Sequence, residues 1–259
     1  MNVFRVFISV CLILASLAAC AKNRQQRALN ALEGMRAEQY FVNQVQAKFV
    51  TAIGIGDVDL AQELLVQGAE VSAIGSEGIT PLIWALLKRS ITTVEFLLHQ
   101  GADPSQATKW TNERDREVWA SPIEIAAMME DPRYLKALLN AGADPNQVIN
   151  DMQKTALSIA LLNRRFDNAK LLISEGASVN HPGKFGSMPV LDAVLGGAFA
   201  SALLLIDAGA DPRLKSINGQ TAIGILQKYG NRGVVIGSED ELAYPKLITL
   251  LKQRGYLSE

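Results

Sequence analysis

A Gly-Ala pair recurs along the chain at nearly constant intervals, and this repetition constrains the fold more than any other feature. The pairs are 33, 41, 34 and 33 residues apart and begin at Gly68, Gly101, Gly142, Gly176 and Gly209. A second series, of Thr, Ser or Met followed by Pro or Ala, widens at the same place: Thr80, Ser121, Thr155, Met188 and Thr221. Their agreement predicts a repeat unit of about 33 residues with one insertion of roughly eight.

The copy that spans residues 80–104 indicates two helices joined by a turn. Thr80 can cap the first helix, and Pro81 suits the first helical position because its missing N–H costs nothing there. The second helix is expected to end where Gly101 takes a left-handed conformation. Second helices share aliphatic pairs: Leu64 and Leu65, Leu97 and Leu98, Leu138 and Leu139, Leu172 and Ile173, Leu205 and Ile206. Because two short helices cannot bury such a face alone, the units must stack.

Residues 80–85 (TPLIWA) and 101–103 (GAD) resemble the T-P-L-H-x-A and G-A-D motifs of ankyrin repeats. The resemblance implies an all-α ankyrin-repeat solenoid of about six helix hairpins with β-turn fingers. The expected units are about 48–75, 76–108, 117–149, 151–182, 184–215 and 217–259. The family's histidine is replaced by Ile83, Glu124, Ser158, Leu191 and Gly224, which predicts less regular fingers. The first unit lacks a Thr-Pro start and the last carries Lys252 at an aliphatic position, so both are interpreted as end caps that face water.

The first residues predict export. Residues 1–19 are read as a signal peptide, since an almost wholly apolar run of 6–19 is too short to span a membrane. Residues 17–20 (LAAC) resemble the lipobox of bacterial lipoproteins, which implies cleavage before Cys20 and acylation of that residue. An ordinary secretory peptide with an incidental Cys20 is the alternative. Cys11 would be removed, so the mature chain would hold no disulfide. Ala21 in the following position favours the periplasmic face of the outer membrane.

Residues 20–47 form a lipidated tether and N-terminal helix between the anchor and the array, which is taken as residues 48–259. The spacing of Leu29, Leu32 and Met35, and then of Tyr40 and Phe41, suggests an amphipathic helix. Two interpretations remain for this segment. Its basic residues contact anionic headgroups, or the segment is a solvated tether followed by a helix that packs on the first repeat. These basic residues are Lys22, Arg24 and Arg27.

Composition and residue content argue against nucleic-acid binding, metal or cofactor binding and catalysis. The net charge of −1 and the pI near 6.2 give no general attraction to nucleic acid, so no nucleic-acid partner is expected. His99 and His181 are too few for a metal site beside an acylated Cys20. No G-x-S-x-G elbow, dinucleotide-binding loop or Ser-His-Asp arrangement stands out. We therefore expect a protein that is not an enzyme and that binds no metal or cofactor.

The eight-residue surplus lies in a loop at residues 105–120 that the resemblance places at the finger edge. Its candidate partner-binding residues are Lys109, Trp110, Arg114, Arg116 and Trp119, with Lys184 and Phe185 of a later finger as weaker members. Trp and Arg are enriched in interface hot spots because a large, rigid side chain loses little entropy on burial. The alternative is that one or both tryptophans fold back on the stack; we expect Trp110 to be the more exposed. A second insertion, around residues 230–241, is expected to be an irregular loop.

These features favour a non-catalytic protein-binding lipoprotein of the cell envelope that is monomeric by itself. Secreted ankyrin proteins of this size resemble the accessory or immunity partners of toxic exported hydrolases, notably phospholipases A. The resemblance implies a hydrolase partner and membrane attachment through acyl chains on Cys20. An alternative from another class is an envelope scaffold that supports a resident periplasmic complex or an oxidative-stress enzyme.

Overall fold

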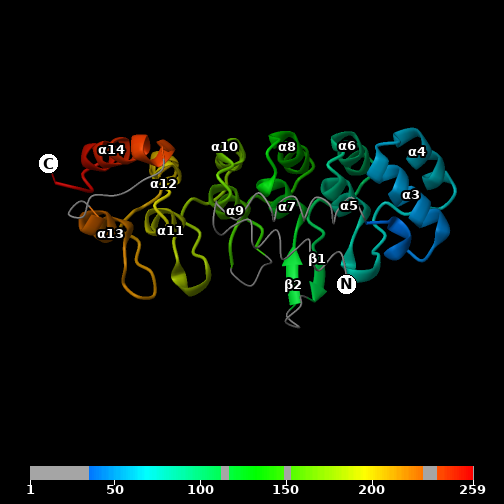
Figure 1. The fold of residues 1–259 in the computed structure, drawn as a ribbon, viewed down its shortest axis with the longest axis horizontal. Coiled ribbons are helices and arrows are strands. Elements are labelled where there is room, and N and C mark those ends of the chain that lie inside the picture. Colours follow the sequence, from blue (N-terminus) through cyan, green and yellow to red (C-terminus); the bar gives the residue numbers. More distant parts are fainter. Residues whose placement is uncertain (1–34, 112–116, 149–152, 230–237, 259) are drawn as a thin grey trace. The chain divides into compact units, whose positions relative to one another are not determined.

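The computed structural model describes residues 35–111, 117–148, 153–229 and 238–258. The chain divides into two compact units, unit 1 (Met1–Asn150) and unit 2 (Asp151–Glu259), each of which stacks helix pairs (Figure 1). In the described part, no helix is both long and apolar enough to cross a membrane. Cys20 and the predicted signal peptide lie outside the described residues.

The described residues of unit 1 form three helix pairs and, beside them, the short elements of the fingers. The first pair is α3 (Gln44–Ile55) with α4 (Val58–Val66), the second is α5 (Pro81–Lys88) with α6 (Ile91–His99), and the third is α7 (Pro122–Met128) with α8 (Pro132–Asn140). The remaining elements are the 3-10 turns η1 (Ala37–Gln39) and η2 (Ser76–Gly78) and the strands β1 (Thr108–Thr111) and β2 (Glu117–Ala120). First helices pack on first helices and second on second, as α5 does on α3 and α7 and as α6 does on α4 and α8.

Unit 2 repeats the same arrangement. Its pairs are α9 (Ala156–Leu162) with α10 (Phe166–Ser174), α11 (Pro189–Leu195) with α12 (Phe199–Asp207), and α13 (Ala222–Tyr229) with α14 (Ser238–Gln253). The 3-10 turn η3 (Lys184–Gly186) lies in the finger that precedes α11. The last helix, α14, packs extensively along α12 and is the longest helix of the unit.

The first helices begin where the Thr/Ser series predicts. The Thr80 hydroxyl accepts a hydrogen bond from the Ile83 N–H at 3.2 Å, and Thr221 accepts one from Gly224 at 3.0 Å. Pro occupies the first turn of α5, α7 and α11. Met188 cannot supply a cap, and α11 begins without a side-chain cap. Where a hydroxyl cap is present, it therefore locates the helix start by accepting from one backbone donor that would otherwise lack a partner.

The second helices end at the repeated glycines, as the Gly-Ala series predicts. Each of these glycines has a φ between +86° and +98°, which an L side chain rarely adopts: Gly68, Gly101, Gly142, Gly176 and Gly209. The first member of every aliphatic pair in the second helices is at most 3% exposed, whereas Lys252 of the last pair is exposed. The predicted shared core is thereby confirmed within each unit.

Three local predictions are wrong. Residues 35–43 are not helical apart from η1, because Tyr40 and Phe41 are both buried and the Tyr40 carbonyl accepts a hydrogen bond from Ser76 N at 2.8 Å. The insertion at 105–120 is not a plain loop but carries strands β1 and β2. The second insertion is helical from Ser238 onward, where α14 begins.

Candidate functional site

The insertion in unit 1 forms an antiparallel two-stranded hairpin. Its register pairs Thr108 with Ala120, Lys109 with Trp119, Trp110 with Val118 and Thr111 with Glu117. Residues that are directly opposite in such a pair share a face of the ribbon, and successive residues alternate between faces. Positions 110 and 119 therefore belong to opposite faces of the hairpin backbone. The β-branched and aromatic content of both strands was the signal in the sequence that could have predicted them.

The base of the hairpin is fastened to the neighbouring finger. The Thr108 side chain is buried, and its hydroxyl donates a hydrogen bond to the Glu77 carbonyl at 3.1 Å. Gly78 has a φ of +73°, and a Cβ there would lie 3.0 Å from the Lys109 nitrogen. The finger and strand β1 thus approach so closely that only glycine fits between them.

The second strand of the hairpin is fastened to α7 at its base by a capping box. The Ser121 N–H donates to Glu124 Oε2 at 3.0 Å, and the Glu124 N–H donates to the Ser121 hydroxyl at 3.4 Å. Glu124 is only 3% exposed and stands where an ankyrin repeat usually has histidine. The S-x-x-E spacing could have revealed this contact. With both strands held at their bases, the insertion is a supported platform.

The predicted partner-binding residues are only partly described. The backbones of Trp110 and Trp119 lie on β1 and β2, and Lys109 is an exposed residue of β1. Arg114 and Arg116 lie outside the described residues, and so do the side chains of Trp110 and Trp119. Lys184 is exposed in η3, an element that also contains the backbone of Phe185, so these two residues belong to unit 2 and not to the hairpin's unit.

A strap of residues 35–41 crosses the first helices of unit 1 and was not recognised in the sequence. At one end Lys88 Nζ donates to the Met35 carbonyl at 3.2 Å, and at the other Tyr40 lies edge-on to Trp84 at 5.9 Å. Burial, with a smaller effect from Glu77, raises the pKa of Tyr40 to about 12. The strap therefore buries Trp84, the tryptophan of the TPLIWA motif, which is 2% exposed.

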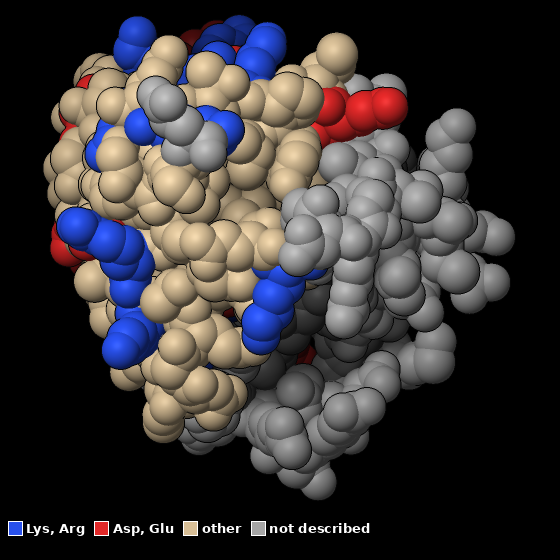
Figure 2. Space-filling view, turned by 90° about the vertical axis from the view of Figure 1, so that its left-hand side faces the viewer, with Lys and Arg blue, Asp and Glu red and all other residues tan. Residues whose placement is uncertain are grey.

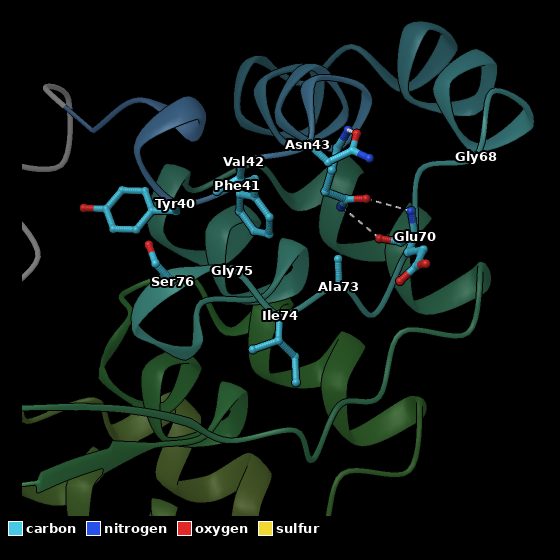
Figure 3. Close-up of a pocket in the computed structure, with 11 residues that line it drawn as sticks. Tyr40, Phe41, Val42, Asn43, Gly68, Glu70, Ala73, Ile74, Gly75 and Ser76 are labelled. Atoms are coloured by element: carbon cyan, nitrogen blue, oxygen red, sulfur yellow. Dashed lines mark hydrogen bonds between the residues drawn. The ribbon is translucent and has the colours of Figure 1, made fainter.

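A hollow of about 390 Å³ lies beside the strap, between α3 and the first finger (Figure 3). Gln46 forms two hydrogen bonds with the Glu70 backbone there, at 2.8 and 3.0 Å, and these tie α3 to the finger. Val42 and Ile74 also line the hollow and are 99% and 67% exposed. Its lining combines these apolar side chains with polar ones, among them Asn43, Glu70 and Ser76.

Titratable groups do not gather into a reactive centre in the part of the chain that is described. No three His, Cys, Asp or Glu residues there lie close enough to hold a metal ion. Burial raises the pKa of Asp192 on α11, against the opposing effects of Lys154 and of a hydrogen bond from Ser187. The described residues thus offer surfaces for binding, with Asp192 as a half-buried acid on a first helix of unit 2.

Comparisons with known proteins agree with this geometry. Residues 77–109 match the family model of the ankyrin repeat. The putative ankyrin repeat protein YahD of Escherichia coli (strain K12) is 26% identical over 195 residues, which cover 73% of this chain and 92% of YahD. Protein PhlB of Serratia liquefaciens is 33% identical over 116 residues, which cover 45% of this chain and about half (48%) of PhlB.

Among solved structures, an ankyrin repeat domain from Acinetobacter baumannii aligns with a TM-score of 0.63 and 25% identity, over 80% of this chain and 97% of that domain. The fold is that of an ankyrin-repeat protein, a class whose members typically serve as scaffolds that bind other proteins. The chain has a bacterial ankyrin homologue in YahD, and its repeats give it a role in protein–protein interaction.

Proposed function

We propose that this ankyrin-repeat protein is an envelope lipoprotein that captures an exported hydrolase, with a phospholipase A as the candidate, and holds it inactive. The observation that carries the proposal is the hairpin of residues 108–120, which no regular ankyrin finger requires and which is held at both bases. A supported hairpin can present contact residues without a large loss of entropy on binding.

The sequence of the hairpin favours recognition of a protein. Two tryptophans and several charged residues lie within thirteen residues, and such residues dominate the energy of protein interfaces. Acylation of Cys20 would keep the array at the membrane where a lipid-degrading enzyme does damage. The resemblance to accessory or immunity partners of secreted phospholipases A supplies the class of partner.

Binding tests the recognition surface directly. Trp110→Ala combined with Arg114→Ala should weaken capture of the hydrolase at least tenfold, measured by calorimetry with the non-acylated mature chain. A matched control is Val66→Ala with Lys136→Ala, which removes one exposed apolar group and one exposed cation elsewhere in unit 1. Equal affinities for the two double variants would remove the hairpin from the proposal.

A second variant tests whether capture depends on where the hairpin is held as well as on its contact residues. Gly78→Val keeps every candidate contact residue but places a side chain against the Lys109 backbone. It should weaken capture while unfolding as a folded, cooperative protein in urea. Unchanged affinity in this variant would show that capture does not depend on where the hairpin is held.

Inhibition is tested in cells and in vitro. Co-expression with the candidate phospholipase should reduce its toxicity, and the purified mature chain should lower its hydrolysis of phospholipid vesicles. Equal toxicity with and without this protein contradicts an immunity role. If only resident envelope proteins co-purify, the scaffold alternative replaces the proposal.

A further inference from the structure

The first helix pair and the residues that flank it expose an unusual share of the large apolar side chains. Nine large apolar side chains are exposed among the described residues, and five of them fall within residues 42–74: Val42, Ile55, Leu60, Val66 and Ile74. The first member of a repeat array normally turns a polar face to water. Exposed apolar side chains at this position indicate that another group covers part of this end.

One part of this face is a groove of about 340 Å³ beside the strap. Ile55, Thr51 and Gly54 of α3 line it, together with Trp84 and Lys88 of α5 and residues 35–38 of the strap. Ile55 is 72% exposed there. The groove is therefore bounded by an exposed aliphatic side chain, an indole and an ammonium group.

The indole of Trp84 lacks an acceptor. Its Nε1 atom is buried and has no hydrogen-bond partner among the described residues. It lies beside Gly54, where a Cβ would be only 2.6 Å away. Lys88 Nζ is 5.1 Å from the ring centroid and donates to the Met35 carbonyl. Burying an indole N–H without a partner costs free energy, so we expect the groove to receive an oxygen that accepts this hydrogen bond.

The first described residue of the chain lines this groove. This residue, Met35, is 4% exposed. The residues directly before it include Leu29 and Leu32 at helical spacing, and Glu33. They offer two aliphatic side chains to cover Ile55 and a carboxylate or backbone oxygen to face the Trp84 N–H and the Lys88 ammonium.

We propose that residues 29–34 of this chain occupy the groove, with Leu29 and Leu32 packed on Ile55 and an oxygen of this segment accepting the Trp84 Nε1–H. The first repeat is then completed by the segment that precedes it. The proposal does not depend on the identity of a binding partner or on acylation.

Docking would shorten the tether. A chain reaches at most about 3.6 Å per residue, so nine residues from Cys20 to Leu29 span roughly 30 Å and fifteen to Met35 span roughly 50 Å. If Cys20 is acylated as proposed above, the docked segment keeps the first repeat within the shorter distance of the membrane.

The Trp84 indole N–H reports on docking. In the full mature chain with Cys20→Ser, its ¹⁵N resonance is assigned by its loss in Trp84→Phe. Leu29→Asp with Leu32→Asp should shift this resonance and speed its hydrogen exchange at least tenfold. The matched control, Asn23→Asp with Asn30→Asp, adds the same charge at positions that a helix would place away from Leu29 and Leu32. It should leave the resonance position and the exchange rate of the Trp84 N–H unchanged. The same shift and exchange rate in the two double variants would overturn the proposal.

A cross-link gives a second measurement that does not rely on the aspartates. With Cys20→Ser, Leu32→Cys and Ile55→Cys should oxidise to an intramolecular disulfide, whereas Asn30→Cys with Ile55→Cys should stay reactive to a thiol reagent. Equal reactivity in the two pairs would contradict docking, and would leave the groove to an external partner.

Discussion

The first and last helix pairs each lack a neighbouring repeat on one side, and they differ in the side chains that they expose. The first pair, α3 with α4, exposes three large aliphatic side chains, Ile55, Leu60 and Val66, whereas the described residues of the last pair, α13 with α14, expose one, Leu242, among exposed lysines. Figure 2 views the end of unit 2 that α13 and α14 form and shows Lys and Arg side chains with few acidic ones among them. Its exposed lysines are Lys215, Lys228, Lys246 and Lys252.

This difference indicates that the last pair is better suited to face water than the first. Among its described residues, the last pair keeps Leu247 and Leu251 fully buried and turns lysines outward, and it exposes a single large aliphatic side chain, Leu242. The first pair relies on residues 35–41, and on the segment that we propose before them, to cover Trp84 and its neighbours. The charges differ as well. The described residues of unit 1 hold seven Lys/Arg and thirteen Asp/Glu, a net −6, and those of unit 2 hold eleven and eight, a net +3.

The largest expected effect is at the covered end. Trp84→Ala should lower the free energy of unfolding of unit 1 by about 3–5 kcal/mol, because it empties a buried aromatic site beneath the strap. The equivalent Ile225→Ala in α13 is half-buried and should cost about 1 kcal/mol. Urea unfolding followed by circular dichroism measures both, and equal losses would contradict the difference between the ends.

A smaller effect is expected where α14 is fastened to the rest of unit 2. The Asp240 carboxylate accepts from Arg164 at 2.8 Å and from the Ala200 N–H at 3.0 Å, and its side chain is 11% exposed. Asp240→Ala should therefore cost about 2 kcal/mol. In the exposed control Asp207→Ala, which loses only a 3.4 Å contact with Arg254, the cost should stay below about 0.5 kcal/mol. Similar costs would show that α14 does not depend on this ion pair.

Replacing one helical glycine in each terminal pair, Gly54 in α3 and Gly224 in α13, should affect stability differently. Gly54→Ala should cost about 1–2 kcal/mol, since the new Cβ meets the Trp84 indole at 2.6 Å. Gly224→Ala in α13 meets only the Thr221 hydroxyl, at 3.2 Å, and should change the stability by about zero or raise it slightly. Thermal unfolding compares the two, and a neutral Gly54→Ala would mean that the indole has room to move.

The smallest effect depends on pH. Because the pKa of Tyr40 is about 12 in the folded protein and near 10 when unfolded, the buried phenol contributes stability that is complete below pH 10 and is lost as the pH rises towards 12. Wild type should lose stability relative to Tyr40→Phe between pH 10 and 11.5 in urea titrations. Parallel curves for the two proteins would show that the strap does not bury the phenol.

Much of the fold was predictable because its signals are local. A hydroxyl at position 80 with Pro81 behind it starts a helix, and Gly101 ends the next one, through contacts only a few residues apart. The prediction of a helix for the strap rested on the apolar series Leu29, Leu32 and Met35, followed by Tyr40 and Phe41. What holds Tyr40 and Phe41 in another conformation is Ser76, which is more than thirty residues away. The hairpin's location depends likewise on Thr108 meeting Glu77.

The sequence by itself determined the period, the helix starts and ends, the apolar positions of each pair and the place of the insertion, because these follow from backbone capping and from side-chain spacing within one unit. Tertiary structure alone decided that residues 35–41 contact α3 and α5, that the insertion is held against the finger of Glu77 and Gly78, and that the buried Trp84 N–H has no partner among the described residues. Those features depend on pairs of residues that are distant along the chain, and no local pattern records which distant backbone will come within hydrogen-bonding or van der Waals distance.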